Sequence, residues 1–187
     1  MGALVLALGV VVAAGALWSM LVYNGLVRLR QHALESFSQV DVELDRRRAL
    51  VPNLVESVKG WAHHERETLS AIAAARAGRD DHGPSKERLE GETRLSGAID
   101  ALIVACEAYP DLQSSDGFRR LSGELAHTED RIAAALRFFN SNVRAYETRR
   151  QGLPEALIAS TLGFQPMEYY RLPVGVAREP QRNLLAA

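Results

Sequence analysis

The sequence has one cysteine, Cys106, among its 187 residues. A lone cysteine excludes an intrachain disulfide framework and a zinc site built from cysteines. The chain also lacks a basic excess, because its formal net charge is −1. Binding to nucleic acid normally needs such an excess, so no nucleic-acid partner is expected. β-branched residues are sparse after residue 60 and no convincing alternating strand pattern occurs, which favours an all-α fold.

Charged side chains are absent from the run between Ala3 and Val22. These roughly 20 residues are long enough as a helix to cross a hydrocarbon core about 30 Å thick. Trp18 and Tyr23 lie near the end of the run, where aromatic rings prefer the headgroup level. We therefore expect a transmembrane anchor over residues 1–24, with the lipid bilayer as partner of residues 3–23. A signal peptide cleaved near Ala14-Gly15-Ala16 and a buried soluble helix are the alternatives.

Orientation follows from the distribution of Lys and Arg. The side of the run before Ala3 has none, whereas Arg28 and Arg30 follow soon after it. The positive-inside rule then places the C-terminal domain in the cytoplasm and the N-terminus outside.

Apolar residues recur at steps of three and four after the anchor, which indicates amphipathic helices. The pattern runs from Leu26 to Leu44 and again from Val51 to Ile72. Pro52 lies between the two pieces, and a helix from 25 to 77 would extend about 80 Å, so a turn is expected at residues 49–52. Two further helices follow, one from Ser85 to Pro110 and one from the polar residues 114–117 to Gln151.

Four helices of similar length joined by short loops predict an antiparallel four-helix bundle over residues 25–153. A short apolar segment and a tail occupy residues 154–187. Because Pro166, Pro173 and Pro180 oppose a long helix there, we expect the tail to be mobile from about residue 172.

Several short segments match a known pattern, namely Tyr23-Asn24-Gly25-Leu26-Val27, Pro52-Asn53-Leu54-Val55-Glu56, Glu107-Ala108-Tyr109-Pro110-Asp111-Leu112, Arg137-Phe138-Phe139-Asn140, Val143-Arg144-Ala145-Tyr146 and Gly163-Phe164. In these segments the chain resembles the LemA family of bacterial membrane proteins. The resemblance implies an N-terminal anchor in the bacterial inner membrane followed by a four-helix bundle. The chain also looks like the family to which a magnetosome-membrane protein of magnetic bacteria belongs, and this resemblance implies roles in membrane organisation. The resemblance implies no defined biochemical activity.

Candidate sites are few. His63 and Glu67 lie four residues apart on one expected helix face, a spacing used by metal sites, but adjacent histidines on a polar face are usually solvated. Residues 46–48, three arginines interleaved with nearby acids, are expected to form a salt-bridged surface rather than to bind lipid headgroups. Asn53 and Glu56 are expected to cap the second helix. Cys106 is expected to be a small core residue.

No catalytic, cofactor or metal residues are assigned from the sequence, and we expect neither an enzyme nor a bound cofactor. The favoured function is a membrane-anchored scaffold or interaction module that binds protein partners or its own copies. A membrane-remodelling oligomer and, less favoured, a metal-binding bundle are the alternatives.

Overall fold

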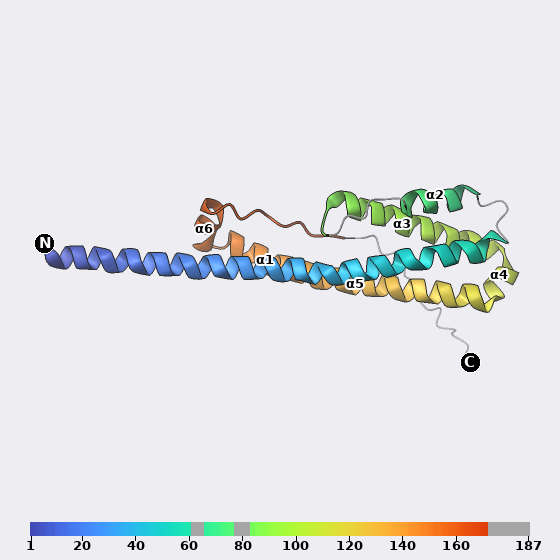
Figure 1. Cartoon of the computed structure of the whole chain (residues 1–187), viewed down its shortest axis with the longest axis horizontal. Helices are drawn as coiled ribbons and strands as arrows, with labels where there is room; N and C mark the ends of the chain where they lie inside the picture. The colour runs from blue at the N-terminus through green and yellow to red at the C-terminus, as the bar shows by residue number, and fades with distance from the viewer. Residues whose placement is uncertain (61–65, 77–82, 172–187) are drawn as a thin grey trace, which may run out of the picture. The chain divides into compact units, whose positions relative to one another are not determined.

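The computed structural model describes residues 1–60, 66–76 and 83–171. Within these ranges the chain forms helices and turns and no strand, which confirms the all-α fold (Figure 1). The helices are α1 Gly2–Lys59, α2 Arg66–Arg76, α3 Lys86–Ala105, the 3₁₀ turn η1 Cys106–Ala108, α4 Pro110–Ser114, α5 Asp116–Gln151 and α6 Glu155–Thr161. Their arrangement as one antiparallel four-helix bundle over residues 25–153, and the domain boundaries at 24 and 153, stay predictions.

The turn expected at residues 49–52 is wrong, because α1 continues through Pro52 to Lys59. A proline inside a helix costs about 3 kcal/mol through a lost hydrogen bond and a clash with the preceding turn. Val51, Leu54 and Val58 are fully buried around it, and each contributes roughly 1.5–3 kcal/mol. Burial therefore outweighs the proline. The length of α1 is also not exceptional in this chain, since α5 has 36 residues, about as many as the part of α1 beyond the anchor.

The second predicted helix, from Val51 to Ile72, is also wrong, because α1 ends at Lys59 and α2 begins at Arg66. The caps predicted for the later helices agree with the structure. Ser85 is the N-cap of α3, and its side chain accepts a hydrogen bond from the Arg88 N–H. Ser115 likewise accepts one from the Phe118 N–H at the start of α5. Pro110 begins α4 at its first turn, where a missing N–H costs nothing. Polar caps and prolines thus set these boundaries as the sequence indicated.

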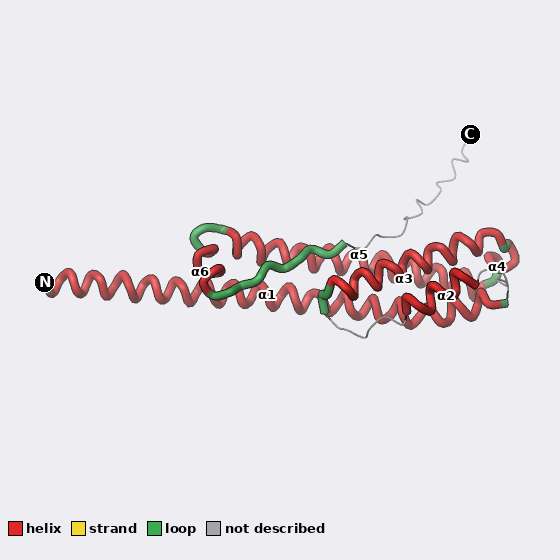
Figure 2. The backbone as a smooth tube through the Cα atoms, turned by 90° about the horizontal axis from the view of Figure 1, so that it is seen from above, coloured by secondary structure: helices red, strands yellow, loops and turns green. Residues whose placement is uncertain are grey.

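The chain divides into two compact units, of which unit 1 comprises residues 1–39 and 135–170. In it the C-terminal part of α5 runs antiparallel to α1, and α6 lies beside α1 just past the end of the apolar run (Figure 2). Val22 and Leu26 of α1 are buried with Tyr146 of α5 and Ala159 of α6. Further along, Phe37 and Phe139 meet edge to face, 5.1 Å between ring centroids. Apolar packing therefore joins three helices in unit 1.

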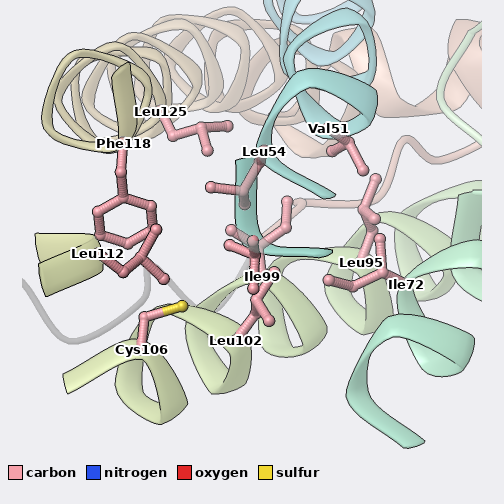
Figure 3. Close-up of a cluster of buried hydrophobic side chains, with 11 residues drawn as sticks. Val51, Leu54, Ile72, Leu95, Ile99, Leu102, Cys106, Leu112, Phe118 and Leu125 are labelled. Carbon is pink, nitrogen blue, oxygen red and sulfur yellow. The ribbon is translucent and has the colours of Figure 1, made fainter. Parts of the chain in front are cut away.

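Unit 2 comprises residues 40–134, together with residue 171 of the described chain. Its core gathers apolar side chains from every helix of the unit (Figure 3), namely Val51, Leu54, Val58, Ile72, Leu95, Ile99, Leu102, Cys106, Leu112, Phe118 and Leu125. Cys106 is one of them, which confirms its place in the core. These residues follow the apolar periodicity of the sequence, so the helical faces were predicted correctly, although the turn at Pro52 and one continuous helix from Val51 to Ile72 were not.

Candidate functional site

Within unit 1, the N-terminal part of α1 has no other helix beside it (Figure 1). Every side chain from Met1 to Trp18 is exposed, and Val22 is the first buried one. Of the most apolar 18 residues in this helix, 6% are buried. An apolar surface of this size is costly in water, and a helix of this length and composition can cross a membrane. The low burial also opposes the alternative of a buried soluble core helix.

A groove of about 380 Å³ opens in unit 1 just past the apolar run. One wall is α1 and the other is the turn after α6, and the lining residues are Tyr23, Val27, Arg30, Gln31, Leu162, Gly163, Phe164 and Gln165. The rings of Tyr23 and Phe164 meet edge to face at 5.6 Å. Gly163 has a φ of +72°, a left-handed conformation that favours glycine and lets the chain turn back here. The groove combines two aromatic rings with one cation, Arg30.

A strap, residues 162–170, runs from α6 back along unit 1 without helix or strand (Figure 2). Side chains of α5 satisfy its backbone instead. Asn140 donates to the Tyr170 carbonyl at 2.7 Å and accepts from the Tyr170 N–H at 3.0 Å. The Tyr146 hydroxyl donates to the Gln165 carbonyl at 2.7 Å. These bonds fix the strap, and with it the groove wall, to α5.

Glu147 holds the middle of the strap by accepting a hydrogen bond of 2.7 Å from the Met167 N–H. Burial acts to raise the pKa of Glu147, but hydrogen bonds from Arg150, Met167 and Gln151 outweigh it and leave the pKa below its ordinary value. Glu147 is therefore a carboxylate at neutral pH. Next to it, burial raises the pKa of Tyr146, which keeps the hydroxyl available as a donor.

A buried charge cluster lies in unit 2. The Arg47 side chain is 0% exposed and donates to Glu92 at 2.5 Å, to Glu129 at 2.7 Å and to the Ser96 hydroxyl. Arg48 also pairs with Glu92. Burial, together with the charge of Glu129, raises the pKa of the nearby Asp100, although Arg47 acts to lower it. The cluster joins α1, α3 and α5.

The expected salt-bridged surface at residues 46–48 is therefore wrong for Arg47, which is buried. Its partners come from other helices and not from Asp41, Glu43 and Asp45 of its own. Two of those acids also pair with arginines of other helices: Asp41 with Arg88 of α3 at 2.5 Å, and Glu43 with Arg131 of α5. Sequence spacing alone favoured acids of the same helix as ion-pair partners of Arg47. In the structure, the acids of α3 and α5 pack against α1 and pair with Arg47 instead.

Two other candidate sites have definite outcomes. Asn53 and Glu56 cap no helix, because both lie inside α1, where Glu56 pairs with Lys59 at 2.8 Å. The possible metal pair of His63 and Glu67 lies outside the residues and side chains that the structure describes.

Sequence reasoning missed the strap and the buried cluster. Asn140, Tyr146 and Phe164 all fall within the segments that resemble the LemA family, and that resemblance was the signal available for the strap. For Arg47 the signal was its place in the apolar repeat of α1. Chemically, charged and amide groups of one element pair in both networks with groups of another element, an arrangement that holds helices together.

Over the residues that the structure describes, the fold and these sites define an all-helical protein in which one helix is long and apolar enough to cross a membrane. A model of the LemA family matches residues 36–182, which is most of the chain. The protein belongs to the LemA family.

Individual proteins similar to this chain share about a quarter of its residues. Magnetosome protein MamQ of Magnetospirillum gryphiswaldense is 25% identical over 174 residues, covering 79% of this chain and 64% of that protein. Protein LemA of Metamycoplasma hominis is 26% identical over 160 residues, covering 85% of this chain and 71% of that protein. Magnetosome protein MamQ 2 of Paramagnetospirillum magneticum is 25% identical over 175 residues. The chain thus spans less than two thirds of the magnetosome relatives it matches.

Proposed function

We propose that this chain is a single-pass bacterial inner-membrane protein whose helical part acts as a scaffold for protein partners or for further copies of itself. One observation carries the proposal: the exposed apolar stretch and the packed helical faces belong to one uninterrupted helix, α1. A continuous helix has no flexible linker, so an anchor over residues 3–23 holds the first packed residues at a fixed distance from the bilayer. The magnetosome relatives support an association with membranes.

The helical part faces the cytoplasm in this proposal, with the N-terminus outside. Support comes from Arg28 and Arg30, which follow the apolar run closely. The test is a pair of C-terminal fusions in living cells, one to a reporter active only in the cytoplasm and one to a reporter active only outside it. Activity of the cytoplasmic reporter is expected, and activity of the other reporter would reverse the orientation while leaving the anchor in place.

A scaffold is favoured over an enzyme by the chemistry of the buried charges. In unit 2 the buried arginines pair with carboxylates of other helices and hold them. Among the described residues, no three His, Cys, Asp or Glu side chains gather where a metal could bind. The net charge of −1 favours protein over nucleic acid as a partner.

The scaffold role is tested by crosslinking in intact membranes. A photoreactive amino acid placed at Val104 or at Phe138, both large, apolar and exposed, should give discrete crosslinked bands, and the same probe at exposed Arg46 should not. Bands at multiples of the chain's own mass would identify self-association and favour the membrane-remodelling alternative. A chain that gives no band from either position and stays strictly monomeric in detergent would contradict the scaffold.

A further inference from the structure

The outer face of α6 and the turns that flank it expose apolar side chains in unit 1. Leu153 is 79% exposed, Leu157 66% and Leu162 52%. The opposite side of α6 is packed, because Ala159 is buried against Val22 and Leu26 of α1. A short helix with one packed side and several exposed leucines is expected where those leucines meet another apolar phase.

The position of these leucines along α1 can be derived from contacts within unit 1. A Cβ placed on Gly25 would lie 2.5 Å from Nη1 of Arg149, and Phe37 contacts Phe139. In an antiparallel pair, each step back along α1 matches one step forward along α5. Leu153 is therefore level with about residues 21–23, where the exposed apolar run ends. Leu157 belongs to α6, whose Ala159 packs with Val22 and Leu26, and Leu162 lines the groove with Tyr23. All three leucines therefore lie near the end of the apolar run, where the bilayer surface is expected.

The groove beside α6 lies at the level of the lipid headgroups. Arg30 follows Leu21 by nine residues, about 13 Å along the helix, and helical side chains point back toward the N-terminus of their helix. The Arg30 guanidinium thus reaches toward a headgroup layer roughly 5–7 Å thick.

Arg30 is exposed and forms no ion pair among the described residues. No acidic residue lines the groove, and Glu147 of α5 is already bonded to Arg150, Gln151 and the Met167 N–H. The charge facing the groove is consequently positive.

We propose that this end of unit 1 is a lipid-binding site: the exposed leucines enter the boundary between headgroups and acyl chains, and the groove binds the phosphate of an anionic phospholipid through Arg30. Arginine suits a phosphate because its planar donors bind two oxygens at once. The groove volume of about 380 Å³ falls within the range of small-molecule sites, roughly 300–1,000 Å³. The site rests on the proposed function, because it requires the apolar run to cross the bilayer.

Lipid selectivity is tested by native mass spectrometry of the full chain in detergent micelles containing phosphatidylglycerol or phosphatidylcholine. Wild type is expected to retain phosphatidylglycerol preferentially, and Arg30→Gln to weaken that retention about fivefold, the effect of one arginine near an anionic surface. Arg144→Gln is the matched control. Arg144 is exposed, lies level with about residue 30 by the same contacts, and points away from the bilayer because α5 is antiparallel. Equal retention of both lipids, or equal losses in both variants, would overturn the site.

Insertion of the leucines is tested separately with a nitroxide label in vesicles of both lipids. Leu157→Cys and Arg137→Cys each carry the label in a Cys106→Ala background, and both positions are exposed in unit 1. The label at 157 should collide with oxygen more than with a water-soluble nickel complex, and the label at 137 should do the reverse. Equal water accessibility at both positions would overturn the insertion.

The two proposals fail in different ways. If wild type and Arg30→Gln both remain in membranes after alkaline carbonate extraction, loss of lipid selectivity concerns the groove alone. If wild type itself is extracted, the anchor is wrong and the lipid site falls with it.

Discussion

Replacing the buried arginine of unit 2, Arg47→Ala, should destabilise the protein strongly. The change removes a fully buried cation and leaves Glu92, 1% exposed, inside the protein. Breaking a buried ion pair by removing one partner costs about 3–5 kcal/mol, mainly because the remaining charge has lost its compensation.

The loss should fall near the lower end of that range. Arg48 still pairs with Glu92, and the Glu129 side chain is 22% exposed and can be solvated. A loss of about 3 kcal/mol corresponds to a fall in Tm of roughly 6–12 °C for a chain of this size.

Thermal unfolding of the detergent-solubilised full chain, followed by circular dichroism at 222 nm, measures the effect. Arg46→Ala is the matched control, because Arg46 is the exposed neighbour in the same helix, and its expected effect is within about 0.5 kcal/mol. If Arg47→Ala and Arg46→Ala melt together, the buried cluster does not exist as described.

Three further changes test other parts of the structure. Pro52→Ala should stabilise the protein by up to about 3 kcal/mol, because it restores a helical hydrogen bond; a lower Tm would favour the turn. Phe139→Ala should cost about 3–5 kcal/mol as a buried aromatic, whereas the exposed Phe138→Ala should cost little, and equal melting temperatures would refute the ring cluster. Because the pKa of Glu147 is lowered in the fold, its contribution is complete above the ordinary glutamate pKa and is lost as pH falls through the folded value. Exchange of the Met167 amide, corrected for intrinsic rates, should therefore rise on acidification, and Glu147→Gln should abolish that rise.

The helical faces could be predicted because periodicity reports burial directly. Leu26, Phe37 and Leu44 recur at helical spacing, and all three are buried. The end of α1 could not be predicted from Pro52, because a local penalty of about 3 kcal/mol competes with tertiary packing that the sequence does not show. The helix propensity of a residue decides where a helix ends only when few neighbouring side chains are buried.

The strap was beyond sequence reasoning for a different reason. Residues 162–170 show neither the helical spacing of three and four residues nor the alternation typical of a strand. The sequence therefore predicts no regular element there. Their backbone is held by Asn140, Tyr146 and Glu147, which lie 19–30 residues away along the chain. Such hydrogen bonds form only when α5 and α6 are packed together, and the amino-acid composition does not predict them.

The burial of Arg47 could have been predicted from the spacing of its neighbours. Phe37, Val40, Leu44, Arg47, Val51, Leu54 and Val58 are spaced by alternating threes and fours, and all are buried. Arg47 therefore occupies a core position of an apolar repeat, where a polar residue costs stability but restricts which neighbours fit. We infer that the cluster fixes the register of α1 against α3 within unit 2.

A double variant can separate the effect of the cluster on the register of α1 from its effect on stability. Arg47→Met combined with Glu92→Leu should recover most of the stability lost in Arg47→Ala, since apolar residues of similar size replace the ion pair. The same double variant should broaden the distance distribution between spin labels placed on exposed positions of α1 and α3, because several registers become nearly equal in energy. A distribution as narrow as that of wild type would mean that apolar packing alone sets the register, and that Arg47 serves only to neutralise the acids buried around it.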